Sequence, residues 1–236
     1  MKLMDVTDIP TRMQQINQEA EKLRQWLVSN CAISYECQDV RMVMLEALQQ
    51  ANSSVGLWMN SLVAIKYELF AQGMSEVEYL ERIGCGLKSA GMAEDMMIDY
   101  LRISYITTVN FKVEHLLRTL LSQENGKKLR GFSMIVDALN NKLSDCLSDI
   151  EKNYLLAFAA VRNSLHNNGI NCTADLDVII SGVEHNVRKG HAITCAGWEH
   201  IIELVARIID VVSKILRDAN MRMDKEILDE FVSLGI

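Results

Sequence analysis

Proline is almost absent from this chain: of 236 residues, only Pro10 is a proline. Proline breaks helices because it lacks a backbone N–H and its ring clashes with the preceding turn. Beyond the first dozen residues, nothing of this kind interrupts a helix. Glycines are also few, and several follow stretches of helical periodicity, where a residue with positive φ commonly ends a helix. These absences favour an almost wholly α-helical protein.

Long apolar runs and paired cysteines are missing as well. The most apolar late stretch, 201–216, carries charged residues at helical intervals, which indicates an amphipathic helix and not a membrane span. The six cysteines are scattered, without any CxxC pair, and the first residues turn polar too soon for a signal peptide. We therefore expect reduced thiols, a cytoplasmic location and no membrane association.

The sequence also has no long run of basic residues. Acidic residues outnumber basic ones, 31 to 24, and the formal net charge is −7. A protein that binds nucleic acid without specificity needs broad positive charge, so this balance counts against that class. It still allows an enzyme with a small electropositive site. Hydrophobic residues make up 49% of the chain, which is ample for a folded core and excludes a disordered protein.

Hydrophobic periodicity and capping residues predict an all-α helical bundle with a small β-hairpin or extended insertion before the last long helix. The β-prone segments are 178–180, 183–187 and 191–195, with a turn at Arg188–Gly190. One or two further helical turns are expected after Asn220. The predicted helices cover about 8–28, 36–71 with an interruption near 52–54, a short helix from Ser75 to between Gly84 and Gly91, 93–123, 127–143, 149–167 and 198–217.

One predicted helix carries the most informative residues. Ser148 and Glu151 form a capping box at its start, and Asn167-Asn168-Gly169 is typical of a helix end. Its buried face is expected to hold four apolar residues, Tyr154, Phe158, Val161 and Leu165. A parallel stripe, one position further on, holds Leu155, Ala159, Arg162 and His166. Arg162 and His166 are therefore neighbours, about 40° apart in projection, and can point together into a groove or a subunit interface.

This pair suits a specific chemistry. Ribonucleases without a metal remove a proton from the 2′-hydroxyl while a cation stabilises the phosphorane. Histidine fits the proton step because its pKa lies near neutrality, and arginine fits the phosphate because its planar fork binds two oxygens. Asn163 and Asn167 can add hydrogen bonds to a sugar or a phosphate.

The segment Arg162-Asn163-Ser164-Leu165-His166-Asn167-Asn168-Gly169, followed by a short β-like stretch and a last amphipathic helix, resembles the signature of HEPN domains. The resemblance implies a metal-independent endoribonuclease in phage defence or a toxin–antitoxin system, with Arg162 and His166 catalytic and Asn163 and Asn167 supporting. It also implies an RNA substrate, a homodimer with a composite site, and a possible antitoxin or regulatory protein. The core would span roughly 92–218, with residues 1–91 as a helical extension of the single domain 1–236.

Two other interpretations stay open. The family usually has four to six residues between arginine and histidine, and this chain has three. That spacing keeps both side chains on one helix face, and it also fits a catalytically inactive HEPN-like module that binds RNA, a nucleotide or a protein partner. Alternatively, Arg162 and His166 serve structure alone, because cations near a helix C-terminus complement the helix dipole.

A metal site is the weaker possibility. Five potential ligands share one region, but their spacings match no zinc module: Cys172, His185, His191, Cys195 and His200. We predict neither a metal nor another cofactor.

Overall fold

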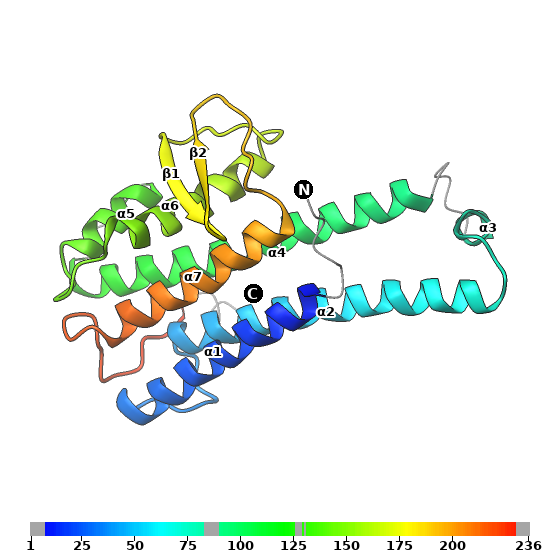
Figure 1. Ribbon diagram of the computed structural model, residues 1–236. Coiled ribbons are helices and arrows are strands. Elements are labelled where there is room, and N and C mark those ends of the chain that lie inside the picture. The colour runs from blue at the N-terminus through cyan, green and yellow to red at the C-terminus, as the bar shows by residue number, and fades with distance from the viewer. Residues whose placement is uncertain (1–7, 83–89, 126–128, 130, 230–236) are drawn as a thin grey trace.

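The computed structural model describes residues 8–82, 90–125, 129 and 131–229. Figure 1 shows long helices and a small hairpin, which confirms the predicted fold class. In chain order the elements are α1 (Asp8–Asn30), α2 (Val40–Ala71), α3 (Glu76–Arg82), α4 (Ala90–Asn125), α5 (Phe132–Asn140), α6 (Asp149–Leu165), β1 (Leu176–Ile180), β2 (Val183–Val187) and α7 (Trp198–Arg217).

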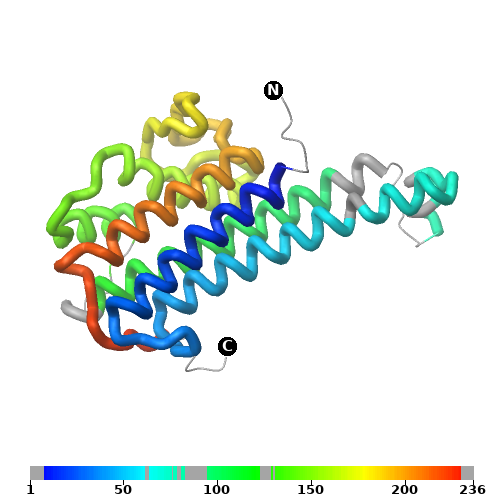
Figure 2. The backbone as a smooth tube through the Cα atoms, turned by 60° about the horizontal axis from the view of Figure 1, so that its bottom comes forward, coloured from blue at the N-terminus to red at the C-terminus, as the bar shows by residue number. Residues whose placement is uncertain are grey.

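Four long helices, α1, α2, α4 and α7, lie side by side and enclose most of the core (Figure 2). Helices α5 and α6 and the hairpin pack against α4 and α7 on one flank of this layer. The apolar stripe of α7 explains its central place, since it contributes buried residues at every turn, Ile201, Val205, Ile208, Val212 and Ile215 among them. One continuous cluster of buried apolar side chains joins these elements.

Three helical predictions need correction. Helix α2 runs unbroken through 52–54, because Asn52 is buried and its side chain hydrogen-bonds to Asn17 and Tyr105. Helix α5 is shorter than the expected 127–143. The tail at 218–229 contains no helix, because its backbone hydrogen-bonds to α2 and the segment before it. The expected end of the short helix, between Gly84 and Gly91, lies largely outside the described residues.

The structure contains the predicted hairpin, but its strands are joined at Ser181–Gly182 and not at the predicted turn Arg188–Gly190. Strands β1 and β2 pair antiparallel, with Val178 opposite His185 and Ile180 opposite Val183. Ser181 and Gly182 join them with φ of 52° and 77°, as a two-residue hairpin turn requires. Arg188–Gly190 does form a turn, closed by a hydrogen bond from His191 N–H to the Arg188 carbonyl. It leads into a loop and not into a third strand.

A two-helix arm extends from the body. The C-terminal part of α2 and the N-terminal part of α4 continue beyond the other helices and hold α3 at their far end (Figures 1 and 2). The Tyr105 hydroxyl donates to Asn52 Oδ1 at 2.7 Å and ties α4 to α2. The predicted capping box of Ser75 and Glu78 starts α3.

The C-terminal segment is anchored by a buried ion pair at the start of α2. Asp39 caps α2 and accepts two hydrogen bonds from the Arg41 guanidinium, each at 2.8 Å, and both side chains are buried. Arg41 also donates to the carbonyls of Met223 and Lys225, while Asp39 accepts from Ile227 N–H. Residues more than 180 positions apart in sequence thus share one buried polar cluster.

Candidate functional site at the end of helix α6

Helix α6 is held firmly at both ends. The Ser148 and Glu151 capping box is present in both directions at its start. At its other end, Gly169 N–H donates to the Ser164 carbonyl at 2.8 Å, and Asn168 and Gly169 have positive φ of 52° and 81°. Asparagine and glycine tolerate this left-handed conformation, so the helix stops where the sequence predicts. The motif residues therefore occupy the C-terminal end of a fixed helix.

Arg162 lies half-buried on the last turn of α6. Its Nη1 donates to Asn163 Oδ1 at 2.7 Å, so part of the guanidinium is held by the neighbouring residue. Its Nε is buried and has no hydrogen-bond partner among the described residues. A buried donor without a partner costs free energy.

His166 caps the end of α6 and is exposed to solvent. Its Nε2 lies 3.5 Å from the hydroxyl of Thr107, which belongs to α4. Asn167 Nδ2 donates to the Asn163 carbonyl at 2.7 Å. The four predicted site residues thus lie at the end of α6. Arg162 is bonded to the Asn163 side chain, Asn167 to the Asn163 carbonyl, and His166 Nε2 faces Thr107 of α4.

Nothing in the sequence predicts the contact between Thr107 and His166. It joins residues 59 positions apart, and α4 passes beside the end of α6 only because both pack into the same core. A threonine in the middle of a long helix is otherwise unremarkable, since its side chain can simply bond to its own helix. Only the tertiary structure brings this hydroxyl to the motif.

The arrangement gives a cation and a titratable base at one helix end. The carbonyls there carry partial negative charge, which favours a positive side chain such as Arg162. If His166 Nε2 carries the ring proton and donates to Thr107, Nδ1 is left free to accept a proton from a ligand. Arg162 lies on the preceding turn, where its guanidinium can contact the same ligand.

A second pair of histidines lies elsewhere. The rings of His185 on β2 and His200 on α7 meet edge to face, with centroids 4.8 Å apart. His185 Nδ1 is 3.3 Å from the Thr194 hydroxyl, while His185 Nε2 and His200 Nδ1 are buried without partners in the described part of the chain. Burial lowers the pKa of both imidazoles; the charge of His200 lowers that of His185 further, and Glu199 opposes the shift at His200.

Within the described residues, no group of three or more histidine, cysteine, aspartate or glutamate side chains is placed to hold a metal ion. Cys195 is buried, and burial raises the pKa of its thiol to about 11. Cys172 and His191 are exposed and turned to backbone carbonyls of their own segments.

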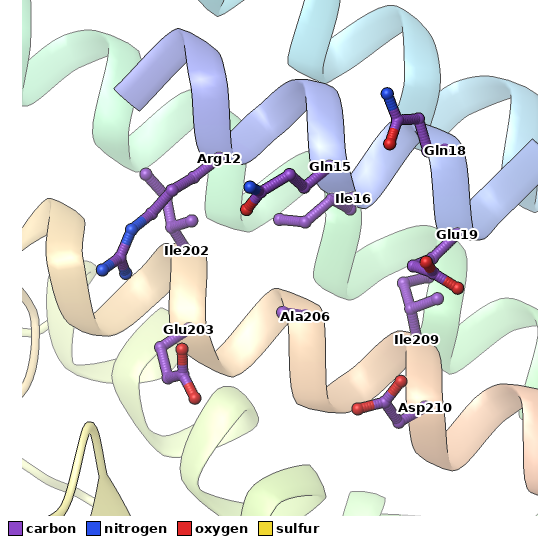
Figure 3. A pocket seen from close by; sticks show the side chains of 10 residues that line it. All are labelled: Arg12, Gln15, Ile16, Gln18, Glu19, Ile202, Glu203, Ala206, Ile209 and Asp210. Atoms are coloured by element: carbon purple, nitrogen blue, oxygen red, sulfur yellow. The ribbon is translucent and has the colours of Figure 1, made fainter. Parts of the chain in front are cut away.

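A surface hollow of about 540 Å³ lies between α1 and α7, away from the motif (Figure 3). Its apolar floor includes Ile16 and Ile209, and carboxylates stand at its rim. Glu19 pairs with Lys22 at 2.6 Å, and Glu203 and Asp210 both face Arg207, at 2.8 and 3.8 Å. Each of these carboxylates therefore already has a cation, and the hollow is an ordinary solvated seam between two helices.

Comparison with known proteins identified no relative of this chain. No protein-family model, no curated protein and no solved structure matches the chain. None of the helices in the described ranges combines the length and apolar character that a membrane span requires.

Proposed function

We propose that this protein is a metal-independent endoribonuclease of the HEPN type. The observation that carries the proposal is the end of α6, where half-buried Arg162 and exposed His166 lie on consecutive turns and His166 Nε2 faces the Thr107 hydroxyl. A guanidinium and an accessible imidazole are the two groups that RNA cleavage without a metal needs.

The proposed reaction follows from these groups. His166 takes the proton of a ribose 2′-hydroxyl, and the 2′-oxygen attacks the adjacent phosphorus. Arg162 stabilises the negative charge of the phosphorane with its planar fork. The bond to the 5′-oxygen breaks, and that oxygen receives a proton from an imidazolium. The products are a 2′,3′-cyclic phosphate and a 5′-hydroxyl, so atoms and charge balance without a cofactor.

We propose further that two copies of the chain combine their motifs in one site. A single imidazole can act as the base in one step and as the acid only in a later step. Two facing copies of His166 provide a general base and a general acid at the same time. Accordingly we expect a homodimer in solution. A role in defence or as a toxin restrained by a regulatory protein belongs to the same proposal, by resemblance alone.

The test is cleavage of mixed single-stranded RNAs in excess EDTA. We expect His166→Ala and Arg162→Ala to lower the rate by about 10²–10⁴-fold, and Arg162→Lys to restore little because lysine lacks the planar fork. His191→Ala and Arg12→Ala, two exposed residues of the same types, are the matched controls. Product ends are identified by mass spectrometry, and folding of each variant is checked by circular dichroism.

A binding module is the second candidate. It is favoured by the hydrogen bond that already holds the Arg162 guanidinium on Asn163 and by the place of His166 as the cap of α6. Absence of cleavage by the folded wild type would overturn the enzyme proposal. If His166→Ala and Arg162→Ala then change only the dimer mass, measured by light scattering, or the affinity for RNA, the binding role is the correct one.

A further inference from the structure

The two-helix arm (Figure 2) and its base carry many exposed large apolar side chains. They are Leu57, Trp58, Ile65, Tyr67, Phe70, Val77, Met96 and Tyr100. The four aromatic side chains among them are 48–85% exposed. At about 150–250 Å² for each side chain, they leave roughly 500 Å² of surface open to solvent. Monomeric proteins rarely expose apolar patches of more than a few hundred Å², so this surface is the one on which we expect a partner.

Charge is absent from the part of α2 where the arm begins. The stretch 47–65 contains no charged residue. A helix without charges around its circumference is normally covered by other protein. The chain itself covers one side of this stretch, where Val55 and Met59 are buried. The opposite side is open to solvent.

The open side of α2 is apolar to the same extent in both directions from Ser61. We call it the Ser61 face, and it consists of Leu57, Trp58, Ser61, Ala64 and Ile65. The four apolar members precede or follow Ser61 by three or four residues, so all lie within about 60° of it around the helix. Leu57, Trp58 and Ile65 are 69%, 48% and 38% exposed. Trp58 and Ile65 form one edge of the face, and Leu57 and Ala64 form the other.

A face of this kind fits a second copy of itself when the two α2 helices run antiparallel. A twofold axis beside Ser61 places the residues that precede it in one copy against those that follow it in the other. Leu57 then lies against Ala64 of the second copy, and Trp58 lies against its Ile65. The small side chains of Ser61 and Ala64 let the helix axes approach to about 8–10 Å. Such an interface is isologous and closes at two copies.

The polar groups on this side of α2 can be buried at little cost. Ser61 Oγ donates to the Leu57 carbonyl and Ser54 Oγ donates to the Gln50 carbonyl, both at 2.8 Å. Both hydroxyl donors are therefore satisfied within the helix and need no water. A twofold axis also brings no like charges together near its centre, because 47–65 is uncharged.

We propose that α2 forms the interface of a symmetric dimer, in which two copies of this chain pack antiparallel along residues 50–72 with the twofold axis beside Ser61. The seam between the two helices is about 33 Å long. The exposed side chains of the arm next to it bring the apolar surface to the order of 800 Å², which a stable interface buries on each partner.

This interface is separate from the motif at the end of α6. The hydrogen bond between Tyr105 and Asn52 places Thr107, the neighbour of His166, level with residue 50 of α2. From residue 50 to Ser61 the helix advances about 16 Å, so the twofold axis sets the two motifs at least about 33 Å apart. The inference therefore does not depend on the proposed function. If the motifs also pair, the two interfaces together give an assembly of four copies.

The first experiment measures the mass of the full chain by sedimentation equilibrium over a concentration series. We expect Trp58→Glu to raise the Kd of self-association by roughly thirty-fold or more, because a buried tryptophan is replaced by a charge. Two controls carry the same change away from the Ser61 face and should keep the wild-type Kd. Tyr67→Glu lies about 120° around α2 from Ser61, and Met134→Glu changes a residue that is 51% exposed on α5. Circular dichroism checks the folding of each variant.

The second experiment tests the register by oxidative cross-linking with copper phenanthroline. Ser61→Cys should link to its own copy, because the twofold axis brings the two thiols together. Leu57→Cys and Ala64→Cys should each fail to link alone and should link when the two variants are mixed. The wild type, treated in the same way, gives the background from its own six cysteines.

The outcomes are independent of any RNA cleavage. A wild type that stays monomeric at every concentration overturns the inference and leaves the arm to a different protein or a lipid surface. A Kd that Trp58→Glu and the controls change alike also overturns it, as does efficient linking of Leu57→Cys to its own copy, which parallel helices would give. A Kd raised by Trp58→Glu alone, together with linking through Ser61→Cys, supports the antiparallel dimer.

Discussion

Thr107 and His166 meet through atoms that no local sequence pattern connects, and their contact decides what the imidazole can do. The Thr107 hydroxyl lies 3.5 Å from His166 Nε2, and the tautomer of the ring decides which of the two groups donates. Arg162 gains its position differently, from the adjacent Asn163. At the scale of single residues, the candidate site thus has one side chain that is bonded within its own helix and one that contacts a neighbouring helix.

Thr107→Val tests this positioning role, because valine keeps the shape and removes the hydroxyl. Under the proposed function, we expect kcat for RNA cleavage to fall by roughly three- to ten-fold with KM unchanged, as the loss of one ordinary hydrogen bond implies. Thr107→Ser should restore most of the rate. The control is Thr108→Val, since Thr108 is exposed on the same helix. Equal rates for the two valine variants would show that Thr107 does not act on His166.

At the scale of elements, the hairpin docks on the start of α7 through His185 and His200. The two rings meet edge to face, and burial lowers the pKa of each in the folded state. The unfolded chain binds these protons at about pH 6.5, and the folded chain only at lower pH. The free energy of unfolding should therefore fall as the pH drops below about 6.5, until the folded imidazoles are themselves protonated.

Urea unfolding at pH 7.5 and 5.5 checks this pH dependence. We expect a lower midpoint at pH 5.5 for the wild type and a smaller difference between the two values for the double variant His185→Phe/His200→Phe. The exposed His191, changed to phenylalanine, serves as the control and should keep the wild-type difference. A difference that persists undiminished in the double variant would mean that other groups cause the acid sensitivity.

Some helix bounds and turns could be predicted from local sequence signals, and others could not. The bounds of α7 and the capped start of α6 were predictable because apolar spacing and Ser148 with Glu151 are local signals. The turn at Ser181–Gly182 was missed because Arg188–Gly190 is an equally good turn, and only strand pairing distinguishes them. Arg162 and His166 could be proposed as site residues from the pattern of one helix, and they stay a prediction, whereas the contact with Thr107 depends on how two helices pack.

At the scale of the whole molecule, the pair Asp39–Arg41 joins the start of α2 to the C-terminal segment. Both charges are buried, and each is satisfied by the other and by the backbone at Met223, Lys225 and Ile227. Removing one member of such a pair leaves an uncompensated charge in the interior, which costs much more than the net worth of the pair.

Arg41→Met should therefore lower the free energy of unfolding by about 3–5 kcal/mol. Asp39→Asn in the same chain should recover part of this loss, because the uncompensated charge is gone. Lys22→Met, which removes an exposed ion pair with Glu19, should cost less than about 1 kcal/mol. Urea denaturation measures all three, and similar losses for Arg41→Met and Lys22→Met would contradict a role for burial.

The same cluster sets an order of events during synthesis on the ribosome. Arg41 is translated 182 residues before Met223, whose carbonyl it needs. At a rate of synthesis of about 5–20 residues per second, Met223 is added roughly 9–36 seconds after Arg41. Until then, the Asp39–Arg41 pair lacks the backbone partners at 223–227 with which it is hydrogen-bonded in the folded protein. The nascent chain thus keeps this corner open to water, and the molecule closes only when the segment at 223–227 arrives.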